Sequence, residues 1–351
     1  MSIQYCDLPP SNGKAYVIPQ LEGEMLSIPG SKGVFRILTS AIQTDDAMSV
    51  FTTGAVLADA PGFHHHNEAH DVFLVTKGYM KLWNGDRCRI LGPGDFASIP
   101  PGVIHNPHGL GPHTESLGLI TPGNWIDFFR YVSESYDGII VPQDDNRNLV
   151  EILIPKIMAA KGKYDVHFHP HHVGCEVGEW DARDTEIPEG TEPYYLRANT
   201  GPRWMLGGVM SRPFSLVRNA DGKFAISSIE SSARYGGSVF DEPRAFNVHH
   251  CFIMFEGLLE VKVEGAEQPV TIHEGETLFL PARTKFELRF KSKFVRFWSF
   301  ASGEGIETLI QEAGSQIKAM VLPDQVEKVD GRKVEELMQR LGSSSSSNGV
   351  A

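Results

Sequence analysis

A pair of strand-and-turn motifs occurs twice in this chain at a nearly constant separation. Gly78 precedes a strand-like run, and Gly257 precedes a similar one. The segment 94–100 begins with glycine and ends with proline, and it has a counterpart at 275–281. The separations of 179 and 181 residues indicate an internal duplication, and therefore two domains of one design.

The motifs lie among short runs that are rich in β-branched and aromatic residues and are closed by Gly, Pro or Asn. Asn84-Gly85-Asp86 separates two such runs and is a strong hairpin signal, and 92–95 predicts another turn. Many short strands at this spacing favour a barrel or jelly roll over an α/β sheet. The predicted fold is all-β, with two jelly-roll barrels, a long linker and a few short helices.

The helices are predicted from apolar spacing, at 125–132, at 306–313 before Gly314, and at 334–341. A linker of about 60 residues is too long for a structureless loop, so we expect it to pack against the barrels. The Ser-rich end of the chain is of low complexity, and we expect it to be disordered. The predicted domains are a first barrel over 1–145, a linker over 146–205, a second barrel over 206–315, and a C-terminal helix and tail over 316–351.

Composition excludes several classes of partner. The chain has 32 basic and 44 acidic residues and a net charge of −12, which argues against nucleic acid and anionic membranes as partners. The sequence contains no run of about 18 apolar residues, so it predicts no membrane span. The N-terminus lacks the pattern of a signal peptide. The four cysteines are isolated, which favours free thiols in a reducing compartment. The expected location is the cytoplasm.

The histidine-rich stretch 64–71 predicts a metal site. His64 and His66 project to the same face if they lie on a strand, whereas His65 points the other way. Asp71 begins the next strand-like run, and His105 follows a turn at the end of another. Three imidazoles and one carboxylate from three segments suit a divalent transition metal.

The spacing of these residues resembles the two motifs of the cupin family, H-x-H-x4-carboxylate-x6-G and G-x5-P-x-G-x2-H. The resemblance extends over both repeats, and it implies that the metal is bound by three histidines and the acidic residue. The matching positions are His64, His66, Asp71 and Gly78 in the first motif, and Gly94, Pro100, Gly102 and His105 in the second.

One position departs from the family pattern, because the acidic residue is usually glutamate and Asp71 is shorter by one methylene group. We expect Asp71 to be the acidic ligand. Glu68 and His70 remain as alternatives for completing the metal shell.

The second repeat lacks this set of ligands. The offset places Pro243 and Ala245 at the first two histidine positions, His250 at the carboxylate position and Phe286 at the third histidine. We therefore predict a metal in the first barrel only, and structural roles for the histidines of the second. A further cluster in the linker, at His167, His169, His171 and His172, has no ligand spacing that we can defend, and we interpret it as a surface loop.

A chain of two such barrels with one metal resembles the fungal quercetin 2,3-dioxygenases, or flavonol dioxygenases. The resemblance implies a small aromatic or polyphenolic substrate, O2 as co-substrate, and Asp71 as both ligand and general base. It also implies copper, although the ligand set leaves Fe, Ni, Co and Mn open; we expect Cu or Fe. Of the aromatic residues in the first barrel, Phe73, Trp83 and Phe96 are candidates to line the substrate pocket.

Fold alone does not fix function, so other classes stay open. One is another metal-dependent cupin enzyme, such as a gentisate-type dioxygenase, an isomerase or a decarboxylase. The other is a non-enzymatic cupin that binds a small molecule. The ligands missing from the second barrel argue against an oxalate decarboxylase, whose relatives usually keep both sites. A homodimer is compatible with the sequence, although no interface signal marks one.

Overall fold

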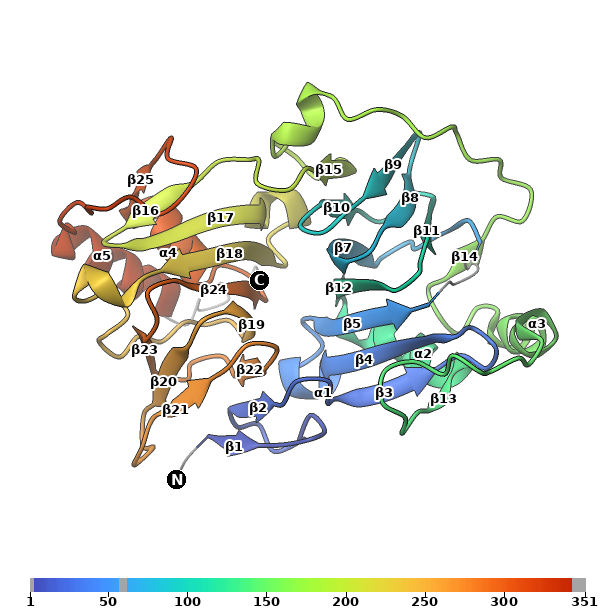
Figure 1. Ribbon diagram of the computed structural model, residues 1–351, viewed down its shortest axis with the longest axis horizontal. Coiled ribbons are helices and arrows are strands. Elements are labelled where there is room, and N and C mark those ends of the chain that lie inside the picture. Colours follow the sequence, from blue (N-terminus) through green and yellow to red (C-terminus); the bar gives the residue numbers. More distant parts are fainter. Residues whose placement is uncertain (1–2, 57–61, 343–351) are drawn as a thin grey trace, which may run out of the picture.

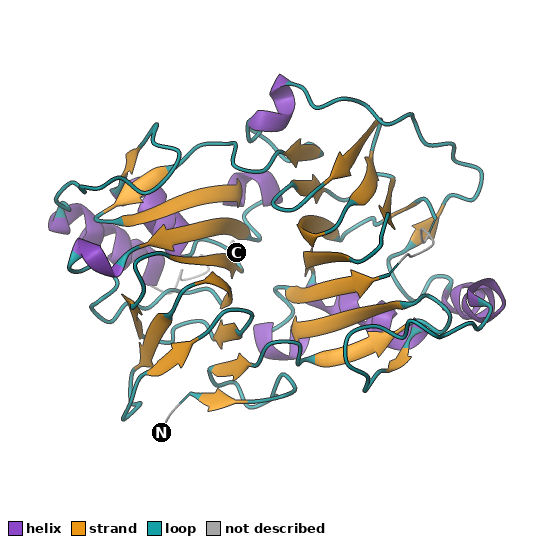
Figure 2. Ribbon diagram, viewed as in Figure 1, coloured by secondary structure: helices purple, strands orange, loops and turns teal. Residues whose placement is uncertain are grey.

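The computed structural model describes residues 3–56 and 62–342 of the chain. Two β domains lie side by side, with the N-terminal half in blue to green and the C-terminal half in yellow to red (Figure 1). Strands dominate both domains, and the longest helices lie at the two outer sides of the molecule (Figure 2). The all-β prediction with a few short helices is confirmed.

The first barrel is built from an eight-stranded and a five-stranded antiparallel sheet. Side chains from both sheets, including Val75, Leu82 and Ile99, form one buried cluster between them. The larger sheet has the order β13 (Glu134–Ser135), β3 (Glu24–Ser27), β4 (Gly33–Thr39), β5 (Ser49–Ala55), β12 (Thr114–Thr121), β7 (His70–Lys77), β10 (Phe96–Ile99), β15 (Tyr194–Leu196). The smaller has the order β14 (His167–Phe168), β6 (His64–His65), β11 (His105–Gly109), β8 (Met80–Asn84), β9 (Arg87–Leu91).

The second barrel combines a nine-stranded sheet with a three-stranded one. The first strands of the chain belong to this domain, because β2 pairs with β22. The larger sheet has the order β1 (Gln4–Tyr5), β2 (Tyr16–Ile18), β22 (Thr277–Leu280), β19 (His250–Glu256), β24 (Val295–Ala301), β18 (Ala225–Ser231), β17 (Val209–Ser215), β16 (Trp204–Leu206), β25 (Ser315–Gln316). The smaller has the order β21 (Val270–Ile272), β20 (Leu259–Val263), β23 (Phe286–Phe290).

Helices are present at the three positions predicted from sequence, and the structure adds several others, among them a 12-residue helix in the linker. The predicted hairpin at Asn84–Asp86 is also present, because β8 and β9 pair directly across it and Gly85 has a positive φ of 65°. The helices are α1 (Ala41–Thr44), η1 (Gly123–Ile126), α2 (Asp127–Val132), α3 (Leu149–Ala160), η2 (Ala182–Thr185), η3 (Val217–Ala220), η4 (Ala233–Tyr235), α4 (Ile306–Ala313) and α5 (Gly331–Gly342). The Ser-rich tail lies outside the described residues.

The linker packs against the first barrel, as expected. Its strand β14 extends the five-stranded sheet by pairing with β6, and β15 pairs with β10 at the edge of the larger sheet. Helix α3 was not predicted from sequence; it begins after the N-cap Asn148 and contains Pro155. The linker therefore contributes both strands and a helix to the domain that carries the predicted metal ligands.

The two domains share a buried apolar interface. It includes Leu74 and Phe96 from the first domain and Tyr16, Phe279 and Phe300 from the second, all fully or almost fully buried. Burial of apolar surface is the main favourable term in protein folding. This interface therefore holds the two barrels against each other.

Candidate metal centre

Three histidines meet inside the first barrel. His64 and His105 are direct partners across β6 and β11, and His66 follows two residues after His64. Each side chain is buried, and one ring nitrogen from each lies within 4.8 Å of the other two. Among the described residues this is the group of histidines, cysteines and acids whose spacing could hold a metal ion.

Each of these imidazoles is oriented by a backbone carbonyl. The Nδ1 atoms lie 2.8 Å from Gly62 O for His64, 2.5 Å from Asp165 O for His66 and 3.0 Å from Val103 O for His105. A carbonyl only accepts, so each Nδ1 carries the proton and each Nε2 presents its lone pair. Such bonds to the other ring nitrogen are the usual support of metal-binding histidines.

Asp71 enters the same cavity from the start of β7. Its Oδ2 lies 3.2 Å from His66 Nε2 and 3.4 Å from His105 Nε2. Those two Nε2 atoms are buried and make no well-directed hydrogen bond, although both lie at ion-pair distance from the carboxylate. Unsatisfied buried nitrogens are costly in a folded protein, and a metal ion on their lone pairs would satisfy them.

The pKa values of His64, His66 and Asp71 are shifted in different directions. Burial lowers the pKa of His64 well below its ordinary value, and the neighbouring His105 and His66 lower it further. Burial also acts to lower the pKa of His66, but the adjacent Asp71 outweighs it and the net pKa is raised. Burial would raise the pKa of Asp71, yet its contacts with His105 and His66 hold that pKa well below the usual range. Asp71 is therefore an anion at neutral pH.

The two alternatives to Asp71 lie elsewhere. Glu68 is exposed and lies in the bend after His66. Its position as an alternative assumed that the strand continues from His66 to Glu68, and the strand does not. His70 is buried, but its Nε2 is 2.7 Å from Ser98 Oγ and its ring packs edge-on against Phe224 of the second domain. Burial lowers the pKa of His70 to about 4, so it is a neutral side chain of the core.

The linker supplies a supporting residue that the sequence did not reveal. The backbone oxygen of Asp165 accepts from His66 Nδ1 and, at 2.9 Å, from Trp125 Nε1. Its carboxylate accepts from the backbone N–H groups of Asn67, Glu68 and Ala69 at 2.7, 2.8 and 3.1 Å. Asp165 thus holds both a ligand ring and the turn that connects His66 to Asp71. An aspartate in an aperiodic linker carries no sequence signal of this contact.

His65 and the linker histidines form a separate cluster on the outer face of β6. His65 Nδ1 lies 2.7 Å from His169 Nε2, and the His65 ring stacks on His167 at 4.9 Å between centroids. Asn67 connects the two sides, because its Nδ2 donates to His167 Nε2 at 2.8 Å. His65 therefore points away from the metal centre, as predicted, and it binds the linker strand β14 to the barrel.

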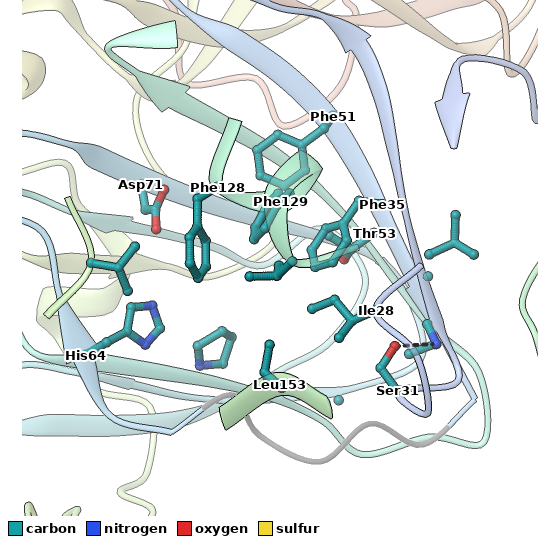
Figure 3. Close-up of a pocket in the computed structure, with 18 of the residues that line it drawn as sticks. Ile28, Ser31, Phe35, Phe51, Thr53, His64, Asp71, Phe128, Phe129 and Leu153 are labelled. Carbon is teal, nitrogen blue, oxygen red and sulfur yellow. Dashed lines mark hydrogen bonds between the residues drawn. The ribbon is translucent and has the colours of Figure 1, made fainter. Parts of the chain in front are cut away.

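An apolar pocket opens from the metal centre. The cavity has a volume of about 220 Å3 and runs from His64 and Asp71 toward Ile28 and Ser31 (Figure 3). Linker helix α3 contributes Leu153 to its wall. Of the three aromatic candidates from sequence, Phe73 lines the pocket. Other lining side chains come from β4, β5, η1, α2, α3 and the segment 166–168, and include Val34, Phe35, Phe51, Trp125, Phe128, Phe129, Val132, Leu149, Ile157, Val166 and Phe168. Strands β8, β11 and β12 contribute Met80, Pro107 and Thr114.

Strand pairing corrects the comparison of the two repeats by one residue. Arg244 pairs with Phe286 as His64 pairs with His105, so Arg244 and Phe246 replace Pro243 and Ala245 as the equivalents of His64 and His66. The expectation failed because the repeat separation drifts between 179 and 181 residues. Phe246, Phe286 and His250 pack together at 5.2 to 5.9 Å between ring centroids. An aromatic cluster occupies the place of a metal centre.

The family comparison agrees with the geometry of the first barrel. Residues 56–114 match the family model described as Cupin domain. This range contains His64, His66, Asp71 and His105. The first barrel therefore contains a segment that matches the cupin domain model, and the resemblance expected from the motifs is confirmed.

Two curated relatives extend over most of the chain. The quercetin 2,3-dioxygenase of Bacillus subtilis (strain 168) is 22% identical over 315 residues, which cover 90% of this chain and 90% of that protein. The quercetin 2,3-dioxygenase of Aspergillus japonicus is also 22% identical, over 83% of this chain and 90% of its own length. This chain is similar to both, and to a bacterial as well as a fungal protein.

Solved structures share the two-barrel fold. A putative glyoxylate-induced protein from Pseudomonas aeruginosa matches with a TM-score of 0.51 at 12% identity, over 82% of this chain and 88% of that one. A variant of Bacillus subtilis oxalate decarboxylase matches with a TM-score of 0.50 at 12% identity, over 83% and 78%. At such identities the likeness shows the fold alone. In the part of the chain that the structure describes, no helix is long and apolar enough to cross a membrane.

Proposed function

We propose that this protein is a metal-dependent dioxygenase that opens a ring of a flavonol-like or related aromatic substrate with O2. The observation that carries the proposal is the position of His64 and Asp71, two of the proposed ligands, at one end of an apolar pocket (Figure 3). The similarity to two quercetin 2,3-dioxygenases over most of the chain supports the same reaction class.

His64, His66 and His105 would hold one divalent transition metal, with Cu or Fe expected and Ni, Co or Mn compatible with the same ligands. A bound metal would supply stabilisation of a substrate oxyanion and a site at which O2 reacts. The three neutral imidazoles leave the charge of such an ion largely uncompensated. Asp71, the fourth proposed ligand, would supply the one anionic group.

Asp71 is also the proposed general base. Its Oδ2 faces the point where the histidine Nε2 atoms converge, and the carboxylate lines the pocket. A carboxylate at hydrogen-bond distance from a phenol or enol can accept its proton as the oxyanion forms. The apolar walls exclude water around this step, which strengthens the attraction between the oxyanion and the metal centre.

The lining disfavours small carboxylate substrates. None of the described residues that line the pocket is Lys or Arg. A gentisate-type or oxalate-type substrate carries a carboxylate group that would find no cationic side chain among these described residues, so the metal ion would be its one cationic partner in the pocket. A metal-dependent isomerase and a non-enzymatic binding protein remain as the other outcomes of the test.

The test is oxygen uptake with quercetin by the metal-loaded protein, together with loss of the flavonol absorbance. Asp71→Ala is expected to abolish both signals, whereas Glu68→Ala is the matched control and should leave them unchanged, because Glu68 is exposed. Absence of both signals in the wild-type protein would contradict the proposed reaction for quercetin. Full metal content and full activity in Asp71→Ala would contradict the proposed role of Asp71.

A further inference from the structure

The substrate pocket has few polar side chains beyond the metal centre, and these are already engaged. Thr53 Oγ1 lies 2.7 Å from Ser116 Oγ. Thr114 Oγ1 donates to Tyr79 O at 3.0 Å, and Ser31 Oγ accepts from the backbone of Gly33 at 3.3 Å. Apart from His64 and Asp71, these are the polar side chains among the described residues that line the cavity.

Aromatic and aliphatic groups make up the rest of the wall. Phe35 stacks on Phe129 with centroids 3.9 Å apart, and Phe51 meets Phe129 edge-on at 5.7 Å. The one indole of the wall, Trp125, turns its N–H away to the backbone oxygen of Asp165. Figure 3 shows the rings of Phe35, Phe51 and Phe129 between the end at His64 and Asp71 and the opposite end at Ile28 and Ser31.

The arrangement separates the pocket into a polar end and an apolar body. An oxygen of the substrate can interact with the metal centre and Asp71 at one end only. A hydroxyl group further along would leave water and meet a mainly apolar wall, whose few hydroxyls already take part in hydrogen bonds. A buried hydroxyl left unpaired weakens binding by about tenfold or more. An aromatic or aliphatic body without hydroxyl groups meets no such penalty and packs against the rings.

We propose that the natural substrate carries its metal-binding oxygens at one end and an unhydroxylated aromatic or aliphatic body behind them. This inference rests on the proposed function, and it makes the substrate class narrower than polyphenols. Among flavonols, the pocket selects the compound that has only the 3-hydroxyl and 4-carbonyl pair over those with further hydroxyls.

The test compares two ligands, 3-hydroxyflavone and quercetin, which share the metal-binding end and differ in the hydroxyls of the body. Binding to the metal-loaded protein is measured without oxygen from the change in flavonol absorbance, and oxygen uptake is measured separately. We expect 3-hydroxyflavone to bind at least about tenfold more tightly. Quercetin binding as tightly or more tightly would overturn the inference.

The other outcomes separate the inference from the proposed function. The expected order of binding without oxygen uptake supports the inference about the pocket and overturns the dioxygenase proposal. No binding of either flavonol overturns both. Val34→Thr, which adds one hydroxyl to the wall at nearly constant volume, should narrow the ratio between the two ligands. Val263→Thr in the second barrel is the matched control and should leave the ratio unchanged.

Discussion

The two barrels keep the same strand ladder and differ at the positions that could bind a metal. Asp71 pairs with Ile99 and Ile120, and His250 pairs with Leu280 and Ala301 in the same places of the second domain. One barrel holds an ionised carboxylate among three imidazoles, whereas the other holds a neutral imidazole among phenylalanines. A duplicated scaffold thus retains its fold when the ligands are replaced, because the strands depend on alternation and turns rather than on the metal.

The largest expected difference is in metal affinity. His66→Ala removes an Nε2 from the histidine group, and we expect a loss greater than the 10–100-fold typical of a supporting residue. His250→Ala in the second barrel should leave metal affinity unchanged while lowering stability by about 2 kcal/mol, because Ile306 N loses its acceptor. Competition with a chelator measures the first effect and denaturant unfolding the second. Equal metal loss in both variants would show that metal binding is not confined to the first barrel.

The next difference concerns Asp71 in the first barrel and Glu307 in the second, two buried acids whose pKa values shift in opposite directions. Burial raises the pKa of Glu307 in α4 to about 7, and its carboxyl makes no regular hydrogen bond among the described residues. The folded protein then keeps a proton that the unfolded chain releases near pH 4.5, the ordinary value for Glu. Stability therefore falls as pH rises from about 4.5 to 7, by about 3 kcal/mol.

Glu307→Gln should remove that fall in stability, as measured by denaturant unfolding at pH 5 and pH 8. Glu312→Gln on the same helix is the control, because Glu312 forms a solvent-accessible ion pair with Arg340. A pH dependence in Glu307→Gln that matches the wild-type protein would show that Glu307 is not the responsible group.

A single histidine should not recreate a metal site in the second barrel. Phe286→His restores the equivalent of His105, but Arg244 and Phe246 still stand where His64 and His66 would be needed. We expect no additional metal and a loss of about 2 kcal/mol, since a polar ring replaces a buried phenylalanine. Phe255→His, at a more exposed position, should cost less. A second equivalent of metal in Phe286→His would contradict the comparison.

The smallest effect is expected in the linker. Asp165→Asn keeps the backbone oxygen that orients His66 but replaces a carboxylate that accepts three backbone N–H groups. We expect about tenfold weaker metal binding, the lower end of the effect of supporting residues. Asp144→Asn, at an exposed position just before the linker, is the control. The measurement is a metal titration of the apoprotein. Unchanged affinity in Asp165→Asn would show that the Asp165 carboxylate does not support metal binding.

The sequence predicted the parts of the molecule that have a local pattern. The alternation of His64 and His66, the glycine-led turns and the apolar helices are all periodic or have fixed spacing, and the structure has each of them. The contribution of the linker was not predictable in the same way, because Asp165 and β14 act through partners about 100 residues away. The shift from Ala245 to Phe246 also needed the strand register, since insertions change the separation of the repeats.

The claim that one barrel binds a metal and the other does not is tested most directly by elemental analysis of the purified protein and of His105→Ala. We predict about one divalent transition metal per wild-type chain, and almost none in His105→Ala. Two metals per wild-type chain, or one that persists in His105→Ala, would contradict the claim.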